Sequence, residues 1–242
     1  MSQIQLIIAG VFVFFGTGCL QTLKLTPEVT SEWGNVAVVS TAASKLNFAF
    51  VGTTAFNNSY VSKDLENDEI DRMITNDVVQ ILSSQGIKAL PSSSIRQLVL
   101  ESSGDSYYRS KIDFGRISSE LGANNTFTHL AVLKGGRHAP AAYLGDPIGG
   151  SNQSLYGIGL YQRSLLGITD GAYFYAVASV QLYDLKTGKK VAGGTDLQFV
   201  KTNLVAFPKN EDEVKAEKTT LFLKQNYNII LEAFENATGN LF

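Results

Sequence analysis

Cys19 is the residue whose surroundings define its chemistry most sharply, because it is the single cysteine among 242 residues. A lone thiol excludes an internal disulfide, but its thiolate is a nucleophile that accepts covalent modification. It follows the almost wholly apolar run Ile4–Phe15 and the small residues 16–18. The run is shorter than the roughly 20 residues that span a bilayer. It has the length of a signal-peptide core that precedes a cleavage site.

This segment resembles the lipobox of bacterial lipoproteins. In that family the cysteine thiol receives a diacylglycerol, the peptide before the cysteine is removed, and the new amino terminus is acylated. The resemblance implies a signal peptide over residues 1–18, lipidation of Cys19 and a tether over residues 19–34. The sequence departs from the family pattern because no Lys or Arg precedes the apolar run and because Gly16 stands where Leu is commoner. The alternatives are an ordinary cleaved signal, or an uncleaved anchor, with an incidental cysteine.

Leu20, the residue after the cysteine, bears on which membrane would hold the chain. In enterobacterial lipoproteins an Asp at this position signals retention in the inner membrane, so by resemblance Leu20 favours the outer membrane. We therefore expect a protein on the periplasmic face of the outer membrane, anchored by acyl chains on Cys19. Each buried methylene of such a chain contributes about 0.8 kcal/mol to membrane binding.

The composition indicates a globular domain and argues against nucleic acid as a partner. Charged residues make up 17% of the chain, hydrophobic residues make up 44%, and the formal net charge is −2. Binding nucleic acid requires clustered Lys and Arg side chains. No stretch of this sequence is strongly basic, so we expect no nucleic-acid partner.

Other residues that could do chemistry lack the companions that they would need. His129 and His138 are nine residues apart with no second cysteine, which matches no compact zinc pattern. The carboxylates at positions 64, 66, 68 and 71 are not a calcium loop, because Glu69 stands where such a loop requires glycine. The chain has no Gly-x-Ser-x-Gly elbow and no phosphate-binding glycine loop. We therefore expect no metal, no cofactor and no enzymatic activity.

An aromatic group with an arginine is the remaining candidate site. Its members are Tyr156, Tyr161, Arg163, Tyr173 and Tyr175, in a region rich in glycine. Protein interfaces are enriched in aromatic side chains and arginine. The group therefore predicts a partner-binding surface. The alternative is that the rings are partly buried under the surrounding loop.

The elements that must position these residues follow from periodicity and turn chemistry. Runs rich in β-prone residues indicate strands, and apolar residues at helical spacing between an acidic first turn and Gly86 indicate a long helix. Turn residues 184–189, with Gly188 supplying a positive φ, predict an antiparallel hairpin. The expected elements are strands over 35–40, 46–56 and 126–133, a helix over 67–86, short helices after 91 and 113, a hairpin of 173–183 with 190–200, and a long helix over 211–237.

This order of elements predicts one α+β domain over residues 35–242. We expect a mainly antiparallel sheet of about 4–6 strands, packed by two long helices and several short ones. The segment Glu120–Ala123 leads from a helix into the strand 127–132, and Ser179–Val191 spans the hairpin turn.

Those two segments, with the order of the elements, resemble the periplasmic domain of the CsgG-like lipoproteins, which include the curli secretion channel. The amino-terminal domain of the translocation protein TolB is similar. The resemblance implies a domain that presents a sheet edge or face to protein partners in the envelope.

A membrane-spanning hairpin would separate a channel from an accessory protein. Each of its strands needs about 9–11 residues of alternating apolar and polar character. Residues 154–163, paired with 173–181, supply one candidate hairpin. The curli channel subunit supplies two, and the stretch 101–112 is short and polar. We therefore expect an ordered surface loop over 137–171 rather than a membrane-inserted segment.

The function that we expect is that of a non-catalytic assembly or accessory subunit of an envelope complex. That complex would serve secretion, surface appendages or envelope biogenesis, and the partners would be other envelope proteins or further copies of the chain. The alternatives are an oligomeric secretion channel of the curli-exporter type and an envelope hydrolase. For a hydrolase, the sequence offers carboxylates such as Asp113, Glu120 and Asp170, which nothing distinguishes from surface residues.

Overall fold

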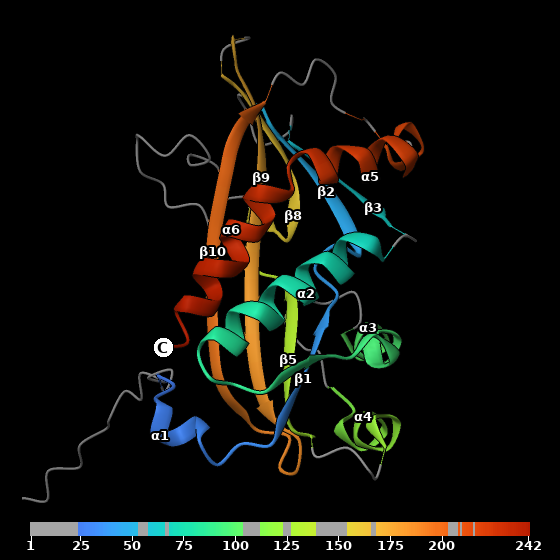
Figure 1. The fold of residues 1–242 in the computed structure, drawn as a ribbon. Coiled ribbons are helices and arrows are strands. Elements are labelled where there is room, and N and C mark those ends of the chain that lie inside the picture. Colours follow the sequence, from blue (N-terminus) through green and yellow to red (C-terminus); the bar gives the residue numbers. More distant parts are fainter. Residues whose placement is uncertain are drawn as a thin grey trace, which may run out of the picture.

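The strand β9 (Ile168–Asp184) is the longest described strand and belongs to one large sheet (Figure 1). The computed structural model describes residues 24–52, 58–65, 68–103, 112–122, 127–138, 154–165, 168–202, 208, 210–214 and 216–242. The predicted signal peptide, Cys19 and the first residues of the predicted tether lie outside the described residues.

Three strands pair with β9: one strand on one side, and two shorter strands placed end to end on the other. On one side, β9 runs antiparallel to β10 (Lys190–Thr202). On the other side, β8 (Ile158–Leu165) pairs with its first half and β5 (Phe127–Gly135) with its second half, both antiparallel. The predicted hairpin of 173–183 with 190–200 is confirmed.

Further strands extend the sheet beyond β8 and β5. β2 runs parallel to β8 and is followed by the antiparallel edge strand β3, while β1 runs parallel to β5 and is followed by the parallel strand β4. A separate two-stranded sheet joins β6 to β7. These strands are β1 (Asn35–Ser40), β2 (Lys45–Val51), β3 (Ser59–Asp64), β4 (Ala89–Pro91), β6 (Arg137–His138) and β7 (Leu155–Tyr156).

The α+β class is confirmed, and the predicted sheet is corrected. The sheet is mixed and has eight strands, whereas we expected mainly antiparallel pairing of about 4–6 strands. The parallel neighbours need long crossover connections, and these leave no local turn signal in the sequence. β7, β8 and the start of β9 also lie in the region 137–171, which we expected to be a surface loop.

Glycines lie where β5 ends and β8 begins as the neighbour of β9. The carbonyl oxygen of Val177 accepts a hydrogen bond from the N–H of Gly136 (2.7 Å), and the N–H of Val177 donates to the carbonyl oxygen of Gly157 (2.8 Å). A Cβ atom on Gly135 would lie 2.6 Å from the Cα atom of Gly157. Since no side chain fits at that distance, glycine is required at this crossing.

Helices cover both faces of the sheet. On the face toward the viewer in Figure 1 lie α2 (Glu69–Ser84), α5 (Ala216–Gln225) and α6 (Tyr227–Gly239). On the opposite face, the 3-10 turn η2 (Ser93–Ile95) and the short helices α3 (Arg96–Ser103) and α4 (Phe114–Leu121) pack against the half of the sheet that contains β1 and β5. The expected helix over 67–86 is confirmed as α2.

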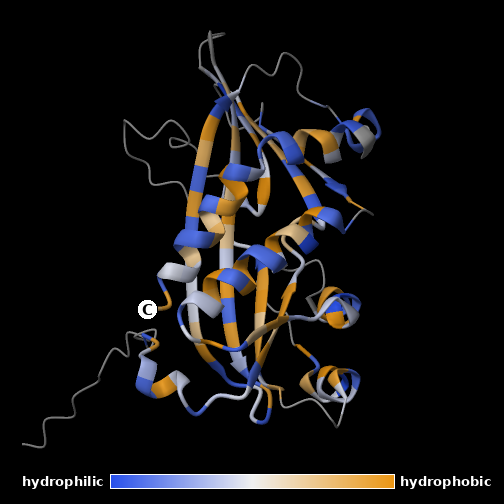
Figure 2. Cartoon of the chain, viewed as in Figure 1, coloured by the Kyte–Doolittle hydropathy of each residue, from blue (hydrophilic) through white to orange (hydrophobic). Residues whose placement is uncertain are grey.

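Apolar cores lie on both faces of the sheet because side chains alternate along the strands. Val36 and Val38 of β1 face the main core, whereas Ala37 and Val39 face a second core under α3 and α4. β1 and β5 are hydrophobic along most of their length because both of their faces are buried (Figure 2). The helical side of the main core is formed by Ile70, Ile74, Val78 and Leu82 of α2, Leu223 of α5, and Ile230 and Phe234 of α6.

The predicted closing helix over 211–237 is divided at Asn226. The structure instead has a 3-10 turn, η3 (Glu211–Glu213), followed by α5 and α6. The Asn226 side-chain amide donates to the carbonyl oxygen of Phe222 (2.9 Å), and the backbone of Asn226 leaves the helical region with ψ at 18°. Asparagine competes with the helix for backbone hydrogen bonds in this way, which explains the break.

A buried polar cluster joins α2 to the sheet and to α3. Asp71 is 1% exposed, and its Oδ1 accepts hydrogen bonds from Ser40 Oγ (2.7 Å) and from the N–H of Ala43 (2.9 Å). Its Oδ2 accepts two hydrogen bonds from the guanidinium of Arg96, at 3.1 and 2.6 Å. A buried carboxylate is tolerated only when it is paired and hydrogen-bonded. The cluster therefore fixes the end of β1, the β1–β2 turn and the start of α3 to one helix.

Residues 24–34, which we expected within the tether, pack against the body of the domain. Leu25 is buried in the main core, and its N–H donates to the carbonyl oxygen of Leu241 (2.6 Å). The short helix α1 (Pro27–Thr30) follows. The chain is thus held to the folded body from Leu25 onward.

Trp33 closes this segment by stacking on His129 of β5, with ring centroids 3.8 Å apart. The N–H of Gly34 donates to Thr128 Oγ1 (3.0 Å), which also lies 2.8 Å from Nδ1 of His129. Burial lowers the pKa of the His129 imidazole, and the Asp184 carboxylate, which lies opposite on β9, raises it by less. The stack therefore favours the neutral ring.

Asp71→Ala should lower the free energy of unfolding by about 3–5 kcal/mol, because it leaves the largely buried charge of Arg96 unpaired. Urea denaturation followed by circular dichroism measures this difference. Asp68→Ala is the matched control, at the residue before α2, where the side chain makes no capping hydrogen bond. Its ion pair with Arg72 is exposed and worth less than about 1 kcal/mol. Equal losses in the two variants would contradict a structural role for the buried cluster.

Stability should fall as the pH drops through about 6.5. Unfolding restores the ordinary pKa of His129, of about 6.5, so the unfolded state binds more protons in that range. Hydrogen bonds from Thr187 lower the pKa of Asp184, so its contribution is lost only below about pH 4. Between about pH 7.5 and 5.5, the Tm of His129→Gln should decrease less than that of the unsubstituted chain. A decrease of the same size in both would refute the assignment.

Candidate functional site

The strand pairing gathers the predicted binding residues in one region of the sheet. Tyr161 of β8 lies directly opposite Tyr173 of β9, and Tyr175 follows two residues later on the same face. The hydroxyl of Tyr175 donates to the carbonyl oxygen of Tyr156 (3.3 Å). Arg163 lies further along β8, at an irregularity in its pairing with β9. The aromatic group therefore exists as a spatial cluster.

Burial divides this cluster in two. Tyr161 and Tyr175 are 1% and 0% exposed, whereas Tyr156, Arg163 and Tyr173 are half-buried. Tyr161 and Tyr175 therefore fit the alternative interpretation, in which the rings are buried within the domain. Neither ring can contact a partner in this conformation. Partner binding by the three half-buried residues stays a prediction. The two buried rings share an apolar cluster with Ala49, Val51, Leu155 and Val177.

A buried asparagine ties the segment that carries Tyr156 to β2. The side-chain nitrogen of Asn47 donates to the carbonyl oxygen of Tyr156 (2.7 Å), and its side-chain oxygen accepts from Ser62 Oγ (3.0 Å). A Cβ atom on Gly159 would lie 2.6 Å from the hydroxyl oxygen of Tyr175. Glycine at this position leaves room for that hydroxyl, which reaches the same carbonyl as Asn47 does.

The ring of Tyr156 already has neighbours on two sides within the chain. The guanidinium carbon of Arg137 lies 5.9 Å from its centroid, and the ring of Tyr60 meets it edge-on at 6.5 Å. These contacts are in the ranges of cation–π and aromatic pairs. Tyr60 is 41% exposed, so Tyr156 borders one exposed ring, and Tyr173 borders a second exposed apolar surface.

That surface comes from β10, which we did not single out from the sequence. Phe199 is 39% exposed, and its ring lies edge-on to Tyr173 with centroids 6.3 Å apart. Leu197, two residues earlier, packs partly against the buried tyrosines. The position of Phe199 opposite Tyr175 could not be predicted from the turn at 184–189, because an irregularity between Lys190 and Ala192 shifts the register of the hairpin by one residue.

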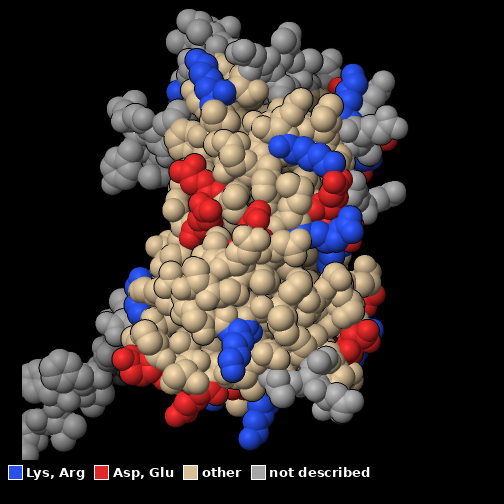
Figure 3. Space-filling view, in the orientation of Figure 1, with Lys and Arg blue, Asp and Glu red and all other residues tan. Residues whose placement is uncertain are grey.

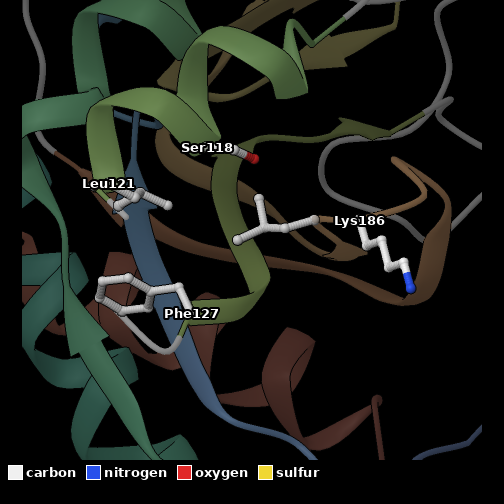
Figure 4. Close-up of a pocket in the computed structure, with 6 residues that line it drawn as sticks. Ser118, Leu121, Phe127 and Lys186 are labelled. Atoms are coloured by element: carbon white, nitrogen blue, oxygen red, sulfur yellow. The ribbon is translucent and has the colours of Figure 1, made fainter. Parts of the chain in front are cut away.

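A pocket of about 210 Å³ lies away from the aromatic cluster, between the end of α4, the start of β5 and the turn after β9 (Figure 4). Leu121, Phe127 and Leu185 form its apolar wall, and Ser118 and Lys186 supply polar groups. Its described lining has no histidine, cysteine or carboxylate. The pocket therefore offers neither a metal-ligand set nor a paired acid and base.

Shifted pKa values occur on β5 and β9 and have structural causes. Burial lowers the pKa of Lys134, and the nearby Lys190 ammonium lowers it further. Burial raises the pKa of Tyr183. The hydroxyl of Tyr183 donates to the side-chain oxygen of Gln181.

Acidic and basic side chains are interspersed over the face in Figure 3.

The described residues contain no group of three or more His, Cys, Asp or Glu side chains that could hold a metal ion. Among the helices of the described chain, none is both long and apolar enough to span a membrane.

Comparisons with known proteins give only distant likenesses. No protein-family model matches the chain, and no curated protein is significantly similar to it. The lipoprotein GNA1162 from Neisseria meningitidis is 8% identical, with a TM-score of 0.31, over 81% of this chain and 99% of that chain. The hypothetical protein CT253 from Chlamydia trachomatis is 9% identical, with a TM-score of 0.33, over 85% of this chain and 98% of that chain. Likenesses this distant support no argument, and the CsgG-like and TolB-like resemblance stays a prediction.

Tyr161→Ala should lower the free energy of unfolding by about 3–5 kcal/mol, because it opens a cavity in a packed apolar cluster. Phe199→Ala, which removes an exposed ring, should cost less than about 1 kcal/mol. Urea denaturation of both variants gives the comparison. If the free energy of unfolding fell strongly in Phe199→Ala and little in Tyr161→Ala, Tyr161 would not be the buried core residue and Phe199 would not be the exposed one.

Proposed function

We propose that the chain is a lipid-anchored protein on the periplasmic face of the outer membrane, and that its α+β domain is a non-catalytic assembly or accessory subunit of an envelope complex. The observation that carries the proposal is the position of Cys19. It is the single cysteine, it follows a signal-like apolar run, and it stands six residues before Leu25, where the chain joins the folded body.

The short spacing restricts how the domain could sit on a membrane. Six residues reach at most about 20 Å when fully extended. An acylated Cys19 would therefore hold Leu25, and Leu241 beside it, within about 20 Å of the lipid surface. The end of β8 and the start of β9 lie at the opposite end of the sheet from α1 (Figure 1). That half of the sheet would project away from the membrane toward partners, with Tyr173 in it and Phe199 opposite Tyr175, near the middle of β9.

The β8–β9 hairpin bears on the alternative of a secretion channel. Residues 158–161 pair with residues 173–176, and both faces of this stretch are buried. Leu160 and Phe174 lie in the main core, whereas Tyr161 and Tyr175 fill the opposite cluster. A membrane-spanning strand needs one face open to lipid. This arrangement favours an accessory subunit over a channel of the curli-exporter type.

Of the three carboxylates named for a hydrolase, Asp113 and Glu120 have described side chains, and neither differs from an ordinary surface residue. Asp113 caps α4 by accepting the N–H of Arg116 (3.1 Å), so it has a structural role. Glu120 is exposed on the same helix, and the side chain of Asp170 lies outside the described residues. The interaction role is therefore preferred to the hydrolase alternative.

Cys19→Ser should abolish acylation and move the protein out of the membrane fraction, because the thiol is the only one in the chain. Metabolic labelling with a fatty acid, followed by fractionation of cells that express the full chain, measures both effects. Thr17→Ser is the matched control, since it changes the same region and keeps the thiol. Unchanged labelling of Cys19→Ser, or a mass spectrum of the parent protein with an intact Met1 and an unmodified thiol, would remove the proposed anchor.

A further inference from the structure

The two sides of the sheet are protected to different degrees. On one side β3 and β4 are short, β4 ends in Pro91, and Lys63 of β3 pairs with Glu211 (3.3 Å). Short length, charge and proline are usual protections of an edge strand. On the other side β10 has 13 residues, and within the described chain it pairs only with β9.

Alternate residues of β10 direct their backbone groups away from β9. The N–H and C=O of Val177 both bond on the β5 and β8 side of β9, to Gly157 and Gly136. Because this direction alternates along a strand, the even-numbered residues of β9 face β10, and their partners in β10 are also even. The odd-numbered residues Leu197, Phe199 and Lys201 therefore point their N–H and C=O groups to the open side.

The earlier part of that open side is already occupied by the end of α6. Asn240, directly after α6, donates from its side-chain nitrogen to the outward carbonyl oxygen of Thr195 (3.2 Å). None of the described residues hydrogen-bonds to the outward backbone groups of residues 197–201. We call these five residues the open segment.

Apolar side chains flank the open segment on both faces of the sheet. Phe199 and Val200 are 39% and 36% exposed, and they point to opposite faces because successive side chains alternate. Tyr173 extends the apolar surface on the Phe199 side. An added strand continues the sheet, so its own side chains would lie beside Phe199 on one face and beside Val200 on the other. The same edge of a second copy brings its own Phe199 and Val200 to these two faces, so this edge is complementary to itself.

We propose that a second copy of this chain occupies the open segment, with the two β10 strands antiparallel across a two-fold axis. An axis perpendicular to the sheet pairs residues of equal parity, so the outward groups of each copy meet those of the other. Pairing of the whole open segment centres the axis on Phe199, which lies opposite itself, and places Leu197 opposite Lys201 of the second copy. This register keeps the Asn240 contact and avoids a like-charge pair of lysines.

Phe199→Cys in the full chain tests this register by disulfide formation in intact cells. Opposed residues of a hydrogen-bonded antiparallel pair have Cα atoms about 5.5 Å apart, within the range of about 4.4–6.8 Å that a disulfide requires. Mild oxidation should give a reducible dimer of two chains, roughly ten times more abundant than with Lys190→Cys. Lys190 is an exposed residue at the other end of the same strand, and the unsubstituted chain reports any coupling through Cys19.

Proline substitutions supply a second measurement that does not depend on thiol chemistry. Phe199→Pro removes an outward N–H, so the domain should remain folded while the fraction of dimer in detergent solution falls at least several-fold. Gln198→Pro removes an N–H that faces β9, so it should destabilise the domain itself. Sedimentation velocity and circular dichroism separate the two effects.

Three results would each overturn the proposal: equal disulfide yields at positions 199 and 190, no adduct at 199 in a folded variant, or an adduct with a different protein. The pairing does not depend on the anchor. A specific dimer through position 199 in a chain whose Cys19 carries no acyl group would leave the pairing intact and remove the proposed localisation.

Discussion

β9 is as long as β8 and β5 together, and these two strands lie end to end along one of its sides. The arrangement of the rest of the sheet depends on this match in length. The 17 residues of β9 lie beside eight residues of β8 and nine of β5. The two strands must exchange places at Val177, where glycines let the backbones approach closely. The sheet therefore has two halves, and each half has its own apolar cluster on the face away from α2 and α6. Within the described part of the chain, β10 is the one strand that spans both halves beside β9.

The two halves have different consequences for function. In the half that contains β1 and β5, the Asp71 cluster, the Trp33–His129 stack and the docked residues 24–34 hold the chain against the body. In the other half, buried tyrosines support a hairpin whose neighbour, β10, keeps an unpaired outer side within the described chain. A firmly packed end near the proposed anchor and an open edge away from it are the arrangement expected of an anchored interaction domain.

Local signals predicted the elements that depend on neighbouring residues. The acidic start and Gly86 bounded α2, and the turn at 184–189 fixed the β9–β10 hairpin. The parallel pairs could not be predicted, because they depend on which strands return to one another after long connections. The break at Asn226 depends on one side-chain hydrogen bond within an otherwise periodic helix. For the candidate site, the cluster could be predicted but the burial of Tyr161 and Tyr175 could not. Tyrosine has an apolar ring and a polar tip, so it suits a core and an interface equally well.

The proposed pairing requires that β10 is an edge strand and that it bonds to β9 through alternate residues. Hydrogen exchange of the backbone amides along β10, measured residue by residue on the dilute full chain in detergent, tests this most directly. The account predicts slow exchange at Gln198 and Val200 and fast exchange at Leu197, Phe199 and Lys201, which slows as the concentration of the chain rises. Uniform protection along β10 at every dilution, or uniformly fast exchange, would contradict it.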